Sequence, residues 1–463
     1  MPNDSYRVML YRTITALGVV LAFLLTLIIH QHMRESTDWS FQYATQNFSQ
    51  GRFTVDGVTI GLEASDANKY EGQLSQYVMI GDDRWALTEA PGYIFYLLPF
   101  YYIHAPELGN LVLAVGMTLV AYLLLKRLRD EKTACLGSLL LLFTPVALAM
   151  MQRAYADSFA ATAFLSIGGG LYIYYCLRQH ELTPRSAGIL LFLAGLGLGW
   201  SVAANYYNAI VVLVFILHFI FVLGRSWISG KRSAAVWAAG WTILGLALPL
   251  AGLLVYQNAV FGSPWRFGFE YAQLPVSFSL RFLRPNIKYV TVALLVDFPL
   301  LLPGIVALFA ALYKKMKSRM LQCKPEEVID TWPELRWDIL LLLVGWIAAV
   351  YGLYLNYEWT ANTPVVGMPF IVMARYYLPA VLPLTIMAVL LLKRIPRKLS
   401  MALTILAMAW GVVFFAQSAL SYPVVPAHSP YNPTASSLPE NTNGTINMLR
   451  IENQNMAIKK FRL

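Results

Sequence analysis

The chain has 463 residues, of which 58% are hydrophobic and only 13% are charged. These proportions leave too little polar surface to cover a soluble globule of this size, so they indicate an integral membrane protein. The formal net charge is +10. The basic residues nevertheless gather at the ends of apolar segments rather than alternating with stacking aromatic residues, which argues against a nucleic acid partner.

Apolar stretches long enough to cross a bilayer recur along the chain. A bilayer core of about 30 Å needs roughly 20 helical residues at 1.5 Å each. About eleven stretches meet this length, at residues 13–33, 108–126, 134–152, 157–177, 187–204, 206–223, 233–256, 289–313, 337–356, 371–392 and 400–421. The first lacks a cleavage site and predicts a retained anchor rather than a signal peptide. The predicted fold class is an all-α polytopic membrane protein.

Lys and Arg fall almost entirely into every second gap between these stretches, which predicts a cytoplasmic N-terminus. Residues 1–422 then form a transmembrane domain with two long outer loops, 34–90 and 258–288. Residues 423–463, rich in Pro, Asn and Ser, form a loosely ordered outer tail. We expect a multi-pass protein of the prokaryotic plasma membrane whose functional face is outside.

The first outer loop interleaves aromatic and polar residues, which predicts short amphipathic helices at the membrane interface. The cysteines Cys135, Cys176 and Cys323 lie in or beside apolar stretches and form neither a disulfide framework nor a metal site. No metal ligand spacing is diagnostic elsewhere, so no cofactor is predicted, although a divalent cation in the acidic first loop stays open.

Short motifs recur on the predicted outer side. They cover residues 38–44, 51–53, 83–93, 97–100, 153–159, 261–269 and 375–379. Their order and shared sidedness resemble the polyprenyl-phosphate-dependent glycosyltransferases of the GT-C type, the protein mannosyltransferase and aminoarabinose transferase superfamily. The resemblance covers residues 10–400 by topology. The chain departs from the family pattern by having Asp38 alone where two acids are common, and Glu89 where many relatives carry a cation.

The resemblance implies a GT-C-like membrane domain with a cavity open to the outside and to lipid. It also implies an inverting transfer of a hexose or pentose from a polyprenyl-phosphate donor to a lipid, glycan or protein acceptor. Such a reaction needs a base for the acceptor hydroxyl, and a carboxylate at the boundary between water and lipid can serve. Asp38 is the predicted base. Asp157, four residues after Arg153, either assists it or pairs with that arginine at a helix start.

The leaving phosphate needs cationic partners, and arginine is suited to paired hydrogen bonds with phosphate. Arg375 and Arg266 are the preferred candidates, with Arg153 and Lys288 behind them. The remaining predicted substrate-binding residues are Glu89, Tyr93, Tyr376 and Asp297. Asp297 falls inside an apolar stretch, where a carboxylate is costly unless it is paired or faces a cavity, so it is either functional or protonated and structural.

Non-catalytic interpretations of the same residues also remain. Asp38 could be a solvated acid beside the membrane, Arg375 could extend to the headgroups, and Tyr376 could belong to an interfacial aromatic belt. Two rival functions also stay open. One is a lipid or solute transporter, and the other is a non-catalytic GT-C-like subunit with membrane-protein partners, since a fold does not dictate an activity.

Overall fold

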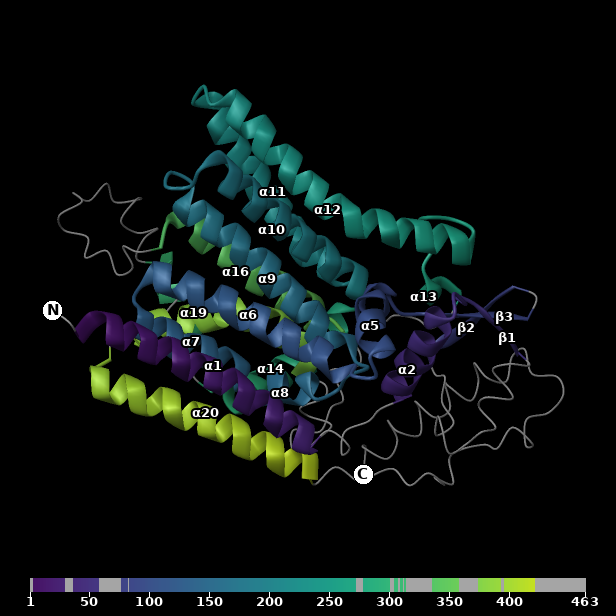
Figure 1. Ribbon diagram of the computed structural model, residues 1–463, viewed down its shortest axis with the longest axis horizontal. Coiled ribbons are helices and arrows are strands. Elements are labelled where there is room, and N and C mark those ends of the chain that lie inside the picture. Colours follow the sequence, from purple (N-terminus) through teal and green to yellow (C-terminus); the bar gives the residue numbers. More distant parts are fainter. Residues whose placement is uncertain are drawn as a thin grey trace.

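The computed structural model describes residues 3–29, 36–57, 76–81, 83–271, 278–299, 304–306, 309–310, 312–313, 335–357, 374–392 and 395–420. It is a bundle of long helices (Figure 1). Within the described residues, nine helices are long and apolar enough to cross a membrane. They are α1 (Asn3–Ile29), α6 (Glu107–Leu128), α9 (Asp157–Arg178), α10 (Pro184–Ala204), α11 (Asn208–Ile228), α12 (Arg232–Phe261), α16 (Trp337–Tyr354), η3 (Arg375–Ala380) continued by α19 (Val381–Leu392), and α20 (Arg397–Leu420). The predicted polytopic helical fold is confirmed.

A bent pair of helices is apolar enough to form either a tenth, broken span or a re-entrant loop. The first, α7 (Glu131–Leu142), begins at Asp130, whose side chain accepts a hydrogen bond from the Thr133 backbone N–H at 2.7 Å. The second, α8 (Pro145–Met151), is turned by 62° from the first. Proline lacks a backbone N–H and fits the first turn of a helix, so the chain restarts its helix at Pro145.

The predicted span at 289–313 is described only in part. α14 (Leu283–Asp297) follows η2 (Leu280–Phe282) and ends where Phe298 leaves helical geometry. Pro299 comes next, and the residue before a proline is driven away from helical angles. The structure therefore supports nine or ten spans among the described residues, and the count of about eleven stays a prediction. The tail at 423–463 lies outside the described residues.

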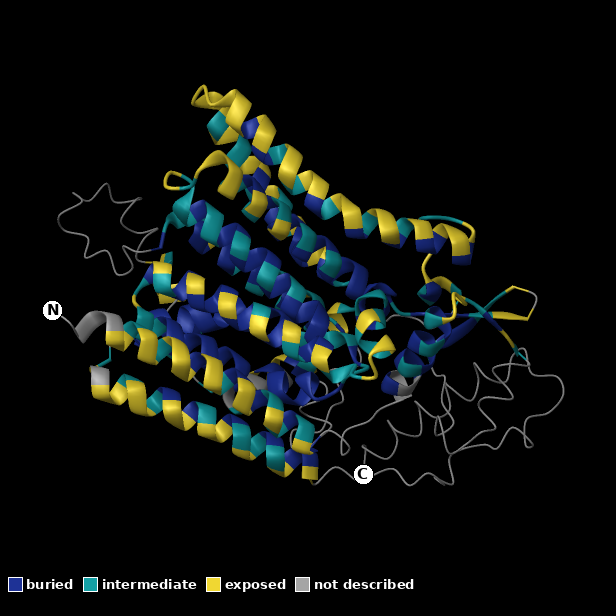
Figure 2. Cartoon of the chain, viewed as in Figure 1, coloured by how far each residue is buried: buried dark blue, intermediate teal, exposed yellow. Residues whose placement is uncertain are grey.

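Glycines set the spacing of the central helices. A Cβ atom added to Gly197 of α10 would lie 2.8 Å from the Cα atom of Gly168 on α9, and one added to Gly245 of α12 would collide with the Phe192 carbonyl of α10. Small residues of this kind let helices approach closely in a membrane. Figure 2 shows α9, α10 and α19 mainly buried, while α12, α20 and α1 turn exposed faces outward. Those apolar outer faces are suited to lipid.

One end of the bundle carries the additional elements (Figure 1). They are α2 (Ser36–Ser49), α5 (Gly92–Tyr102), α13 (Gly268–Tyr271) and an antiparallel sheet of β1 (Val55–Asp56), β3 (Arg84–Leu87) and β2 (Tyr77–Gly81), in the order β1-β3-β2. We call it the site end. The N-terminus of α1 and the start of α12, at Arg232, lie at the opposite end, which we call the basic end. Arg127 and Arg178 both pair with Glu181 there, Arg336 donates to the Cys176 carbonyl, and Arg12 pairs with Glu131 at the start of α7.

The small sheet was not predicted from the sequence. Val55 pairs with Trp85, and Val78 pairs with Ala86. The strand residues are rich in β-branched and aromatic types, which favour strands. Asp83 adopts a positive φ of 57° in the turn before β3, and its Oδ1 atom accepts a hydrogen bond from the Gly57 backbone N–H at 3.1 Å. The preference of these residue types for strands was visible in the sequence, but β3 spans only residues 84–87, which is too short for a clear prediction.

Candidate active site

An open cavity with a volume of about 90 Å³ lies at the site end. It is bounded by α2, the turn before α5, the segment between α8 and α9, the turn between α10 and α11, α13, the end of α16, and η3. Segments distant in sequence therefore meet at one place. Its polar lining residues are Glu89, Arg153, Asp157, Ser158, Asn205, Asn208 and Arg375.

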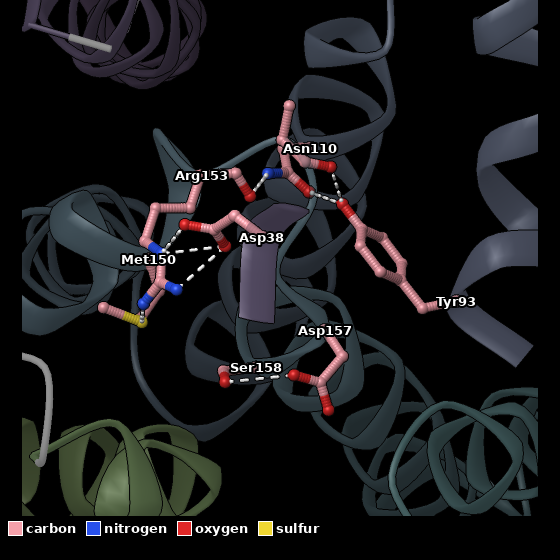
Figure 3. A network of polar contacts seen from close by, with 8 residues as sticks. Asp38, Tyr93, Asn110, Met150, Arg153, Asp157 and Ser158 are labelled. Atoms are coloured by element: carbon pink, nitrogen blue, oxygen red, sulfur yellow. Dashed lines mark hydrogen bonds and ion pairs between the residues drawn. The ribbon is translucent and has the colours of Figure 1, made fainter. Parts of the chain in front are cut away.

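Asp38 and Arg153 form a buried ion pair at the edge of this cavity (Figure 3). The Arg153 Nε atom donates to the two Asp38 oxygens at 3.2 and 3.0 Å, and its Nη2 atom donates to Oδ1 at 2.8 Å. The Arg153 side chain is 1% exposed and that of Asp38 is 7% exposed. Arg153 lines the cavity, whereas Asp38 is not among the lining residues. Because a planar guanidinium held by a carboxylate has a fixed direction, Asp38 orients Arg153.

The backbone that carries Arg153 is held by two buried side chains (Figure 3). Asn110 of α6 donates to the carbonyls of Met151 and Arg153 at 2.9 and 3.2 Å. The Tyr93 hydroxyl of α5 donates to the Ala154 carbonyl at 2.6 Å and lies 3.2 Å from the Asn110 side-chain oxygen. Tyr93 was predicted to bind substrate, but it is fully buried and does not line the cavity. Its position instead supports the turn beneath Arg153.

Asp157 is the first residue of α9 and lines the cavity. Asn205 Nδ2 donates to its Oδ2 atom at 3.0 Å, and Ser158 Oγ donates to its Oδ1 atom at 3.3 Å. Its carboxylate also interacts electrostatically with Arg375 and Arg153, and the N-terminus of a helix favours a negative charge. The Asp157 carboxylate is therefore fixed in position by hydrogen bonds and can accept a proton at the cavity surface.

Aromatic rings form a continuous part of the lining, which we call the aromatic wall: Tyr207, Phe269, Tyr354, Tyr357 and Tyr376. Ring centroids of Tyr207 lie 6.3 Å from those of Phe269 and Tyr354. Those of Tyr376 lie 5.1 Å from Tyr354 and 5.3 Å from Tyr357. Burial, reinforced by nearby negative charge, raises the pKa of Tyr207 and of Tyr357. Their hydroxyls therefore stay neutral and can donate hydrogen bonds.

The predicted site residues divide into two groups. The cavity brings together Glu89, Arg153, Asp157, Arg375 and Tyr376 from three distant parts of the chain. Asp38 contacts the group through Arg153. These residues had been predicted to share one site from their common sidedness, and the fold supplies the contact that a sequence pattern does not show.

Besides Tyr93, three other predicted residues lie away from the cavity. Arg266 is exposed, and its Nη1 atom donates to the Tyr271 hydroxyl at 3.3 Å. Lys288 is exposed on α14. Asp297 is fully buried at the end of α14, and its carboxylate oxygens make no hydrogen bond within the part of the chain that the structure describes. Of the two arginines preferred for phosphate, the structure places only Arg375 in the cavity.

Several lining residues were missed by sequence reasoning. Asn205, Tyr207 and Asn208 come from a short polar and aromatic group between two apolar stretches. That group lies on the predicted outer side, which was the available signal. Tyr354 and Tyr357 lie at and just beyond the end of α16, and their place at the end of an apolar stretch was the only signal that the sequence offered.

No cluster of three or more metal-ligating side chains occurs among the residues whose placement is described. The most acidic part of the first loop, with Glu63, Asp66 and Asp82, lies outside those residues. A divalent cation there stays an untested prediction.

No protein-family model and no curated protein matches the chain. Among solved structures, ArnT from Cupriavidus metallidurans bound to undecaprenyl phosphate matches with a TM-score of 0.51 at 13% identity, over 96% of this chain and 72% of that one. The apo form of ArnT matches with a TM-score of 0.51 at 14% identity, over 91% and 66%. Archaeal oligosaccharyltransferase AglB from Archaeoglobus fulgidus, in complex with an inhibitory peptide and a dolichol-phosphate, gives 0.48 at 12% identity, over 88% and 56%. The chain therefore has the polytopic GT-C fold of ArnT, as its motifs predicted.

Proposed function

We propose that the chain is a membrane glycosyltransferase that takes a sugar from a polyprenyl-phosphate carrier in the cavity at the site end. The observation that carries the proposal is a single cavity lined by the carboxylate Asp157 and by two arginines, Arg153 and Arg375. Sugar transfer from a lipid phosphate needs a proton acceptor and cationic partners for the leaving group. The undecaprenyl phosphate bound to ArnT, whose fold the chain shares, supports this type of carrier.

Asp157 is the proposed base. It accepts the proton of the acceptor hydroxyl while that oxygen attacks the anomeric carbon from the face opposite the phosphate. The bond between the anomeric carbon and the phosphate oxygen breaks, its electron pair leaves with the polyprenyl phosphate, and the configuration inverts. Asp38 was predicted for this task, but its oxygens accept the hydrogen bonds of Arg153, so we assign it a positioning role.

Arg375 and Arg153 are the proposed partners of the leaving phosphate. Negative charge grows on the phosphate as the bond breaks, so preoriented guanidinium groups stabilise the transition state more than the ground state. Arg153 is held by Asp38, and the Arg375 guanidinium lies 5.2 Å from the centre of the Tyr376 ring. Both are thereby restricted before a substrate arrives.

The site end would face away from the cytosol. Arginines and lysines flank the helices at the opposite, basic end, and such residues stay cytosolic. The carrier would then enter from lipid, and a lipid, glycan or protein acceptor would enter from the outer aqueous side. A hexose or a pentose would be the transferred sugar.

The test is lipid extraction from the purified full chain followed by mass spectrometry. We expect a co-purifying polyprenyl phosphate, and we expect Arg375→Gln to lower its amount by about tenfold because a charge-assisted contact is lost. Arg266→Gln is the matched control, since Arg266 is an exposed arginine that does not line the cavity. A transported solute or a tightly held partner subunit in place of this lipid would contradict the proposal.

A further inference from the structure

A second hollow lies at the basic end, and it shares no lining residue with the candidate active site. It is a crevice of about 60 Å³ between α7, α19 and α20. Thr133 belongs to the first turn of α7, Leu392 is the last residue of α19, and Ser400 belongs to the first turn of α20. A cavity of this size has room for about four water-sized groups, so it can hold a segment of a ligand.

The crevice forms because α20 touches the bundle closely only farther along its length. A Cβ atom added to Gly411 would collide with the Phe143 carbonyl at the end of α7. Nearer its start, α20 borders the crevice at Ser400. Below the crevice α7 and α19 stay close, since a Cβ atom added to Gly137 would lie 2.8 Å from a Val389 methyl carbon. Because α20 lies at the outer edge of the bundle (Figure 1), surrounding lipid can reach the crevice.

The side chains along the crevice change from charged to apolar with depth. α7 and α20 begin at the basic end and α19 ends there, so residue order gives depth. Lys132 and Lys398 lie nearest the mouth. The half-buried Thr133 and Ser400 follow with hydroxyl groups, and the deeper lining is apolar, as at Leu140. A ligand that fits must therefore change from polar to apolar along its length.

The mouth of the crevice carries basic residues. Lys132 precedes Leu136 by one helical turn, which places it on the crevice face of α7. Lys398 is exposed in the first turn of α20. The sequence between α19 and this lysine adds Lys393, Arg394 and Arg397. A group of cations beside an apolar crevice between membrane helices suits the head group of an anionic lipid.

The acids near the mouth are engaged by other parts of the protein. Glu131 pairs with Lys126 and with Arg12 of α1. Asp130 accepts a hydrogen bond from the Thr133 backbone N–H at the start of α7. Cations outnumber these two acids, so the mouth keeps a net positive charge that attracts an anionic ligand.

An anionic diacyl phospholipid has the required order of groups. Its phosphate accepts hydrogen bonds from lysines, its ester carbonyls accept from hydroxyls, and an acyl chain packs on apolar side chains. A polyprenyl phosphate has no acceptor below its phosphate, so the hydroxyls of Thr133 and Ser400 would gain no partner from it. Water is also a poor occupant of the apolar depth. The lining therefore favours a phospholipid.

We propose that this crevice binds one anionic phospholipid of the leaflet at the basic end. The phosphate contacts Lys132 and Lys398, and one acyl chain fills the gap between α20 and the floor formed by α7 and α19. The lipid thereby joins α20 to the rest of the bundle. The site is independent of the proposed function, because it lies at the opposite end and uses none of the residues assigned to sugar transfer.

Native mass spectrometry of the full chain in detergent micelles tests the proposal. The probes are phosphatidylglycerol, which carries one net negative charge, and phosphatidylcholine with the same acyl chains, which carries none. We expect the wild type to bind one phosphatidylglycerol about tenfold more tightly than phosphatidylcholine. Lys398→Gln should reduce this preference to about threefold, and folding should be retained because the side chain is exposed. Lys231→Gln, at an exposed lysine of the same end beside α12, is the matched control and should keep the preference.

A second pair of variants tests whether the lipid occupies the crevice itself. Ser400→Leu fills the crevice and should weaken the binding of both phospholipids by about tenfold or more. Ala402→Leu adds the same side chain at an exposed position of α20 and should change neither affinity. Thermal unfolding without added lipid checks that both variants fold. If Ser400→Leu does not fold, Thr133→Val replaces it, and the loss of one hydroxyl should weaken both phospholipids by about threefold.

Three results would overturn the proposal. Equal affinity of the wild type for the two phospholipids would remove the role of charge. Equal losses of preference in Lys231→Gln and Lys398→Gln would assign the preference to the general charge of the basic end. Displacement of phosphatidylglycerol by undecaprenyl phosphate would assign the crevice to the carrier, whereas we expect the two lipids to bind together. Failure of undecaprenyl phosphate to bind at all would count against the proposed function and not against this site.

Discussion

Helices α9, α11 and α16 bury polar and charged side chains toward both ends, but the two sets are organised differently. Toward the basic end, His218 Nδ1 lies 2.8 Å from the Tyr172 hydroxyl. Arg336 pairs with Asp338 at 3.1 and 2.6 Å and donates to the Cys176 carbonyl at 2.8 Å. None of these residues lines the cavity. At the site end, by contrast, the same helices place Asp157, Asn208 and Tyr354 on the surface of the open cavity.

The comparison shows two different roles for a buried polar or charged group. A group whose partners are protein atoms contributes to stability and to the fit between helices. A group that faces a cavity can still form hydrogen bonds or ion pairs with a ligand. Its incomplete pairing in the free protein costs stability, which the rest of the fold must offset. Substitutions of side chains that line the cavity should therefore change activity more than stability, and those of the basic-end cluster should do the reverse.

The largest effect is expected for Asp157→Asn. Removing the base should lower kcat for sugar transfer by about 10² to 10⁴-fold, the usual contribution of general base catalysis. The thermal midpoint should change less than in Asp38→Asn, because asparagine keeps the shape and one of the two hydrogen-bond acceptors, and Asp157 is only partly buried. Transfer is measured as release of bare polyprenyl phosphate, with Asp338→Asn as the matched carboxylate of the other end. Equal loss of activity in both variants would remove the distinction between the two ends.

Asp38→Asn tests whether the buried ion pair between Asp38 and Arg153 contributes mainly to stability or mainly to the reaction. Arg153, whose side chain is only 1% exposed, would lose its buried carboxylate partner. The free energy of unfolding should fall by about 3 to 5 kcal/mol, as for other buried pairs that lose one partner. It is measured by chemical unfolding in detergent. The double variant Asp38→Leu with Arg153→Met should regain much of the stability.

The opposite result for Asp38 is equally informative. If Asp38→Asn unfolds like the wild type but transfers sugar as poorly as Asp157→Asn, then Asp38 is the base and our assignment of Asp157 is wrong. The two variants thus decide between the two carboxylates that the sequence put forward.

The polytopic helical fold could be predicted from the sequence because hydropathy acts locally, whereas the sidedness of the spans stays a prediction from their basic flanks. The grouping of Arg153, Asp157 and Arg375 could be predicted only through resemblance and sidedness. The pairing of Asp38 with Arg153 could not, since it depends on how α2 docks on the segment between α8 and α9. Distance to a cavity is a property of packing, and for that reason Arg266 looked as suitable as Arg375.

A smaller effect is expected at the basic end for Tyr172→Phe. The variant removes the hydroxyl that lies 2.8 Å from His218 and keeps the ring that packs on Phe215. A net contribution of about 1 kcal/mol to the free energy of unfolding should be lost, as for a typical hydrogen bond. The kcat for sugar transfer should stay at the wild-type value. Tyr6→Phe, on an exposed face of α1, is the control for loss of a hydroxyl alone.

The smallest effect on stability is expected for Asp297→Val, and it decides the role of the carboxyl group that fits neither end. Asp297 is fully buried, and its oxygens make no hydrogen bond to any described residue. An apolar side chain of similar size avoids the cost of burying an unsatisfied polar group, so the free energy of unfolding should change by less than about 1 kcal/mol or increase. Thermal unfolding in detergent and the transfer assay are both needed. A stable variant that transfers sugar a hundredfold more slowly would connect Asp297 to the reaction. A buried group that does not line the cavity would then affect activity more than stability, which would contradict the distinction drawn between the two sets of residues.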